Sequence, residues 1–104
     1  MAAQPADLTF VVDDRDQAER AASAIGANEA LVLEKRGLAG SPAEWLLVIT
    51  VTSRTVLSAA RVALQYLELK RVASIQFGDK KFEKLRDSDV DRVLDLLEKS
   101  MRDE

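Results

Sequence analysis

The amino-acid sequence predicts an α+β domain in which helices pack on one mostly antiparallel sheet, with the element order β-α-β-β-α-β-β-α. Apolar residues recur at every second position in short segments and at helical spacing in longer ones. A chain of 104 residues has the length of one domain, and its only Gly/Pro-rich stretch, residues 37–42, is too short to link two. We therefore expect residues 1–104 to form one domain, with residues 1–6 disordered and residues 102–104 frayed.

The first strand is predicted at residues 8–12, where apolar side chains alternate. Asp14 follows as the N-cap of a helix, with Gln17 as the reciprocal partner of a capping box, and Gly26 ends this helix. The helix must lie close to the surface that it covers, because its apolar stripe is made of small residues: Ala18, Ala21, Ala22 and Ile25.

Residues 30–36 and 44–52 are predicted as the second and third strands, joined by a loop. The third strand is apolar at both parities, which predicts a central strand covered on both faces. Its apolar residues are Trp45, Leu46, Leu47, Val48, Ile49 and Val51.

A helix predicted over residues 53–69, capped by Thr52 or Ser53, has an unusually wide apolar surface. Its polar stripe is one residue wide, and its main apolar face is Val56, Ala60, Ala63, Leu64 and Leu67. A surface helix needs an apolar arc of little more than about 100°, so the extra width is covered either by the C-terminal helix or by another protein. Leu57 widens the face on one side, and Ala59, Val62, Tyr66 and Leu69 widen it on the other. The candidate partner interface consists of Leu57, Val62, Tyr66 and Leu69.

Residues 70–77 and 80–85 are predicted to form a hairpin around a Gly-Asp turn, which places Phe82 on the same side as Ile75. Ser88 is the expected cap of the last helix, whose apolar stripe is Val90, Val93, Leu94, Leu97 and Met101. The first six elements follow the split βαβ order of ferredoxin-like domains. The predicted core is Phe10, Val12, Leu47, Ile49, Val51, Ala60, Leu64, Leu67, Ile75, Phe77, Val93 and Leu97.

The chain contains no histidine and no cysteine. This composition excludes Ser-His and Cys-His nucleophile pairs, thiol redox chemistry and zinc sites of the thiolate or imidazole kind. Glycosidase-type carboxylate pairs need a cleft, for which a domain of this size has little room. We expect a protein that is not an enzyme and that has no cofactor and no metal.

Asp13 and Asp14, directly after the first strand, resemble the paired acids that hold magnesium in response-regulator receivers. A receiver also needs a phospho-accepting aspartate at the end of its third strand, where this chain has Val51-Thr-Ser53. We interpret Asp13, Asp14 and Asp16 as cap and first-turn residues of a helix, with weak metal binding as the alternative.

Two further segments suggest ligands. Thr52, Ser53, Arg54 and Thr55 open a helix and offer amides, hydroxyls and a guanidinium to a small anion, although ordinary capping explains the same residues. The basic residues of segment 70–86 are interleaved with Phe77 and Phe82, as in sheets that stack nucleic-acid bases. The net charge of −3 and the core-like parity of both phenylalanines argue against nucleic acid.

Four segments of the second half carry a resemblance to a known family: Val56-Leu-Ser-Ala-Ala-Arg-Val-Ala-Leu64, Val72-Ala-Ser-Ile-Gln-Phe-Gly-Asp79, Phe82-Glu-Lys-Leu85 and Asp89-Val-Asp-Arg-Val-Leu-Asp-Leu-Leu97. Over residues 44–99 this pattern resembles the effector-associated constant component domains of bacterial conflict systems. The loop at residues 37–44 is shorter and less proline-rich than in that family. The resemblance implies a non-catalytic adaptor encoded beside a peptidase or another effector, and it supplies no site residues.

These observations predict a protein-interaction or adaptor module that binds an effector or forms a homo-oligomer. The alternatives are a ferredoxin-like regulatory domain that binds a small anion at residues 52–55 and a nucleic-acid-binding hairpin at residues 70–86. No membrane association is expected, because the longest apolar run, residues 45–49, is too short to span a bilayer. The N-terminal residues lack a secretory signal pattern, so the expected compartment is the cytoplasm.

Overall fold

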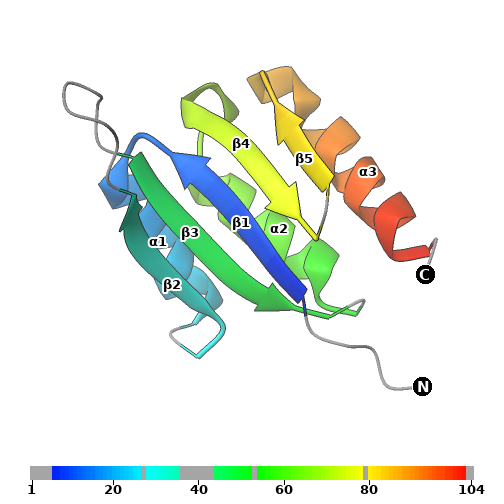
Figure 1. Cartoon of the computed structure of the whole chain (residues 1–104), viewed down its shortest axis with the longest axis horizontal. Coiled ribbons are helices and arrows are strands. Elements are labelled where there is room, and N and C mark those ends of the chain that lie inside the picture. Colours follow the sequence, from blue (N-terminus) through cyan, green and yellow to red (C-terminus); the bar gives the residue numbers. More distant parts are fainter. Residues whose placement is uncertain (1–5, 27, 36–43, 53, 79, 103–104) are drawn as a thin grey trace.

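Five antiparallel strands form one sheet in the order β2-β3-β1-β4-β5 in a computed structural model of the chain (Figure 1). The structure describes residues 6–26, 28–35, 44–52, 54–78 and 80–102, with the backbone alone at residues 87 and 100–102. The strands are β1 (Ala6–Val12), β2 (Ala30–Lys35), β3 (Glu44–Val51), β4 (Val72–Phe77) and β5 (Lys80–Glu83). The helices are α1 (Arg15–Ile25), α2 (Val56–Tyr66) and α3 (Val90–Arg102), with single 3-10 turns η1 (Leu69–Arg71) and η2 (Asp87–Asp89).

The strand order confirms the predicted α+β class and its ferredoxin-like arrangement. The first four strands give β2-β3-β1-β4, and the β4–β5 hairpin extends the sheet by one strand. Phe10 of β1 lies opposite Leu47 on one side and Ile75 on the other. Phe77 pairs with Lys80 and Ile75 pairs with Phe82, so the hairpin has a two-residue turn and the predicted side for Phe82 is confirmed.

The core lies between the sheet and the three helices. Figure 1 shows α2 behind the sheet between α1 and α3, and α2 contacts both of these helices. Of the twelve predicted core residues, eleven are buried, and Leu64 is half-buried against the same cluster. Small side chains let α1 and α2 approach closely, because Ala18, Ala21, Ala60 and Ala63 are all fully buried. The side chain of Met101 lies outside the described residues.

The prediction that β3 is covered on both faces is wrong. Leu47, Ile49 and Val51 point toward the helices and are buried, whereas no described helix covers the opposite face of the sheet, which we call the open face (Figure 1). Leu46 and Val48 lie on that face and are half-buried. They are apolar because they contact the apolar residues of the neighbouring strands β1 and β2, as described below.

The first helix begins and ends where the sequence predicts. The amide of Gln17 donates a hydrogen bond of 3.2 Å to Oδ1 of Asp14, and the amide of Gly26 donates one of 2.9 Å to the carbonyl of Ala22. Gly26 has φ +124°, a conformation that disfavours any side chain. The Gln17 side chain does not complete a capping box; it bonds to Glu68 instead.

The second helix is shorter than predicted. It ends at Tyr66, because Leu67 adopts extended backbone angles and Leu69 then starts η1. At its other end the carbonyl of Thr52 accepts hydrogen bonds from the amides of Thr55 and Val56. Ser53, one of the two predicted caps, lies outside the described residues.

The remaining boundaries differ by short segments. β1 begins at Ala6, which pairs with Val51, so this residue does not belong to a disordered terminus. β5 ends at Glu83 because Lys84 has a left-handed backbone, φ +56°. The turn η2 precedes α3. Asp89, rather than the predicted Ser88, supplies the capping side chain there: its Oδ2 accepts a hydrogen bond of 2.9 Å from the backbone amide of Arg86. Residues 1–5, 103–104 and the predicted loop at 37–42 lie outside the described residues.

Candidate functional site

The predicted partner interface on α2 is only partly available. Leu69 is 1% exposed and belongs to the core, because the chain leaves the helix after Tyr66 and turns this side chain inward. Leu57 and Val62 are half-buried, and Tyr66 is 42% exposed. The extra apolar width of α2 is therefore explained mainly by its place between two helices, and the proposed contact surface loses Leu69.

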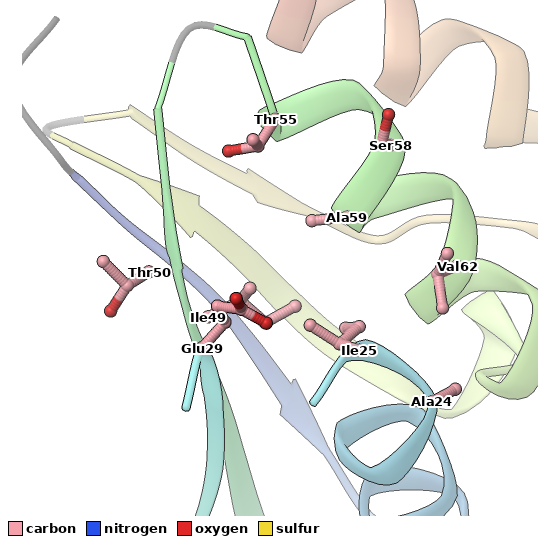
Figure 2. A pocket seen from close by; sticks show the side chains of 9 residues that line it. All are labelled: Ala24, Ile25, Glu29, Ile49, Thr50, Thr55, Ser58, Ala59 and Val62. Carbon is pink, nitrogen blue, oxygen red and sulfur yellow. The ribbon is translucent and has the colours of Figure 1, made fainter. Parts of the chain in front are cut away.

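A pocket of about 280 Å³ lies between α1, α2 and the C-terminal end of β3. Figure 2 shows the side chains of Ile25, Ile49 and Ala59 directed toward the same space, one from each element. Its remaining lining residues are Ala24, Glu29, Thr50, Thr55, Ser58 and Val62. The pocket thus combines Val62 of the predicted interface with Thr55 of the predicted anion site.

The charge at this pocket is negative. Among the described lining residues, Glu29 alone has a formal charge, and it lies just after the C-terminal end of α1. The last turn of α1 contains no basic residue, and helix carbonyls place a partial negative charge at that end. Among the described side chains none forms an ion pair or hydrogen bond with the Glu29 carboxylate.

The predicted anion site at residues 52–55 is arranged as a local turn. The amide of Thr52 donates a hydrogen bond of 2.8 Å to Oγ1 of Thr55, and the two hydroxyl oxygens lie 3.2 Å apart. Arg54 is exposed beside them, and Ser53 is outside the described residues. These contacts use the Thr55 hydroxyl and the Thr52 amide within the turn. Thr55, rather than the predicted Thr52, is the N-cap of α2, and it makes no side-chain capping hydrogen bond to the helix. The carboxylate of the nearby pocket disfavours an anion at this position.

The acidic pair after β1 lies beside an arginine. Nη1 of Arg71 lies 3.9 Å from carboxylate oxygens of both Asp13 and Asp14, and Nε lies 3.9 Å from Glu68. The amide of Asp13 also donates to the carbonyl of Arg71, at 3.1 Å. No group of three or more potential metal ligands occurs among the residues that the structure describes. Asp14 acts as the helix cap that the sequence predicts.

The basic hairpin does not present its aromatic residues to solvent. Phe77 is buried on the helix-covered face, and Phe82 is half-buried against the same core. On the open face, Nζ of Lys81 lies 2.9 Å from Oε1 of Glu83, and this hydrogen bond lowers the pKa of the Glu83 carboxyl. The hairpin therefore lacks the exposed stacking platform that single-stranded nucleic-acid binding requires.

The N-terminal end of β3 has a separate polar contact. The guanidinium of Arg15 lies 5.0 Å from the ring centre of Trp45, within the range of a cation–π interaction. Its Nε lies 2.8 Å from Oε1 of Glu19, and this hydrogen bond raises the pKa of Arg15. These contacts fix Arg15 over the end of the sheet and give no catalytic arrangement.

The open face carries an apolar patch that was not predicted from the sequence. Leu31 and Leu33 of β2 are 50% and 49% exposed, and they lie opposite Val48 and Leu46 of β3. Val11 of β1 lies beside Leu46 and is 6% exposed, but it is not part of the main core cluster. We call these five residues the open-face patch. The available signal was β2 itself, where Leu31-Val-Leu33 is apolar at both parities.

Comparison with known proteins gives no relative. No family model matches the chain, no curated protein matches it, and no solved structure matches it. Within the described residues, no helix has the length and apolar character needed to cross a membrane. The geometry of the surfaces described above is therefore the basis for a functional assignment.

Proposed function

We propose that this protein is a non-catalytic protein-interaction module that binds a partner protein through the open-face patch. The observation that supports this function is the exposure of Leu31 and Leu33 at 50% and 49% on a sheet face that no described helix covers. Contiguous apolar side chains on an exposed surface are typical of interaction sites. The resemblance to effector-associated constant component domains suggests the partner's class: an effector, such as a peptidase, of a bacterial conflict system in the cytoplasm.

The composition of the open face favours a partner protein over an obligate dimer. Obligate dimer interfaces are large and predominantly apolar. Here the apolar residues are confined to β2, β3 and one position of β1, whereas β4 and β5 present Gln76, Lys81 and Glu83 on the same face. A small apolar area at one edge of the sheet, next to polar strands, is typical of an interface between proteins that also exist separately.

The open-face patch can be tested by replacing both exposed leucines. Leu31→Lys together with Leu33→Lys puts two charges into the patch and leaves the buried core unchanged. Gln76→Lys is the matched control, because Gln76 is an exposed residue of the same face on β4. The binding candidates are the proteins encoded by the neighbouring genes, each produced and purified for the measurement.

We expect one of these proteins to bind the wild-type chain and the Gln76→Lys variant and to lose at least about tenfold in affinity for the double variant, as hot-spot residues do. All three chains should show similar unfolding temperatures. Equal binding by the double variant would refute the assignment. If the wild-type chain instead sediments as a dimer and the double variant sediments as a monomer, the open-face patch binds a second copy of this chain.

A further inference from the structure

We propose that the pocket between α1 and α2 binds a small organic cation, a primary ammonium compound with an apolar body of six to eight carbon atoms. The pocket lies on the side of the sheet that the helices cover, and the open-face patch lies on the opposite side. This inference therefore does not depend on the proposed interaction with a partner protein, and each can fail separately.

The size and the walls of the pocket define the apolar part of the ligand. Its volume is about 280 Å³, and a dry protein cavity of about 150 Å³ holds a benzene molecule. The walls come from Ile25 on α1, Ala59 and Val62 on α2, and Ile49 on β3. A phenyl ring or a short alkyl chain fits this space and leaves room for a polar head group at the rim.

The rim selects the charge of the head group. Gly26 has no side chain, and a Cβ added there would lie 2.9 Å from Oε2 of Glu29, so the glycine leaves room for this carboxylate over the end of α1. Two sources of negative charge meet at this point, the carboxylate of Glu29 and the carbonyl end of the helix. A cation placed beside Glu29 would be attracted by both, and an anion would be repelled by both.

No described protein group supplies that cation. None of the nine lining residues is basic, and the last turn of α1 contains no lysine or arginine. The hydroxyl of Thr55 is used by Thr52. The carboxylate of Glu29 is thus a hydrogen-bond acceptor at the edge of an apolar pocket, and it has no partner among the described residues. A primary ammonium group can donate hydrogen bonds to this carboxylate, because its nitrogen carries three donor hydrogens.

The ligand class can be tested with three probes of nearly equal shape: 2-phenylethylamine, 2-phenylethanol and 3-phenylpropionate. Chemical-shift titrations of the isotope-labelled full chain locate and quantify binding. We expect the amine to shift the amides of Ile25, Gly26, Ala59 and Val62 with a Kd of about 1 mM or tighter, which is within reach of ligands of this size. The alcohol should bind about fivefold more weakly, the difference that an exposed ion pair contributes, and the carboxylate should bind most weakly.

Variants separate the charge from the cavity. Glu29→Gln should abolish the preference for the amine over the alcohol, whereas Glu34→Gln, which removes an exposed acid of β2 that does not line the pocket, should preserve it. Ala59→Leu should fill the pocket and prevent binding of both the amine and the alcohol. If that variant does not fold, the comparison of amine and alcohol binding by Glu29→Gln tests the proposal without it. Equal affinities of amine and alcohol for the wild-type chain, shifts outside the pocket, or no saturable binding would each overturn the proposal.

Discussion

Gln17 and Glu68 lie 51 residues apart in the sequence and exchange two hydrogen bonds. Oε1 of Gln17 accepts a bond of 3.1 Å from the backbone amide of Glu68, and its Nε2 donates one of 3.3 Å to Oε1 of Glu68. The contact joins the first turn of α1 to the point where the chain leaves α2. It fixes the segment that turns Leu69 into the core.

Replacing Gln17 by Ala should lower the free energy of unfolding by about 0.5–1 kcal/mol, because an amide of the main chain loses its side-chain acceptor at an exposed site. Chemical denaturation measures this change. Gln65→Ala, at an exposed position of α2, is the matched control and should stay within about 0.5 kcal/mol of the wild-type chain. Equal effects of both substitutions would show that the Gln17–Glu68 contact does not stabilise the fold.

Truncation of Leu69 should cost much more stability than truncation of Tyr66. Leu69→Ala removes a side chain that is 1% exposed and should cost about 2–5 kcal/mol of stability. Tyr66→Ala removes a side chain that is 42% exposed and should cost much less. Thermal unfolding of both variants checks the assignment of Leu69 to the core; a larger loss for Tyr66→Ala would contradict it.

Lys84→Gly should stabilise the protein. Lys84 has φ +56°, a region that costs a residue with a Cβ about 1 kcal/mol relative to glycine. We expect a gain of somewhat less than that amount, because glycine also gives the unfolded chain more freedom. Lys80→Gly, in β5, lacks this backbone strain and should destabilise the protein by about 0.5–1 kcal/mol. A loss of stability in both variants would show that the Lys84 conformation stores no strain.

Stability should be insensitive to pH near neutrality and should fall in acid. The sequence has no histidine or cysteine, whose ordinary pKa values lie between about 6 and 9. The hydrogen bond from Lys81 lowers the pKa of Glu83 from its ordinary value of 4.5, so this carboxylate contributes stability above that value. The contribution is lost as the pH falls through the folded-state pKa.

Urea denaturation from about pH 3 to pH 8 measures this dependence, and Glu83→Gln should show a shallower loss below about pH 4.5. High salt should reduce the difference between the two chains, because the pair is exposed. A transition near pH 6.5, or an unchanged acid limb in Glu83→Gln, would contradict this account.

Most of the fold follows from periodicity, because side-chain spacing reports local geometry. The alternation in β1 predicts that Phe10 and Val12 are buried, and Asp14 and Gly26 mark both ends of α1. The third strand shows where this inference fails. The sequence of Leu46 and Val48 indicates apolar surroundings but does not distinguish a covering helix from a neighbouring strand, and here the neighbours are Leu33 and Leu31.

The candidate site depends on tertiary contacts that no spacing in the sequence reports. The pocket brings Ile25, Ile49 and Ala59 together from three elements. The end of α2 was missed for a similar reason. Leu67 and Leu69 continue the helical apolar pattern, but an extended backbone buries both of them, which satisfies the same hydrophobic requirement in a different way.

The unequal edges of the sheet determine how copies of this chain can join. β2 offers six residues, of which Ala30, Leu31, Val32 and Leu33 are apolar, whereas β5 has four, of which three are charged. Long apolar edges accept additional strands, and short charged edges resist them.

A chain with one accepting edge can add a second copy only through the same edge of that copy. Such a pair is closed by a two-fold axis and leaves charged strands at both ends. The short charged strand β5 therefore disfavours the addition of further chains at its edge, which favours a closed pair over a continuous filament.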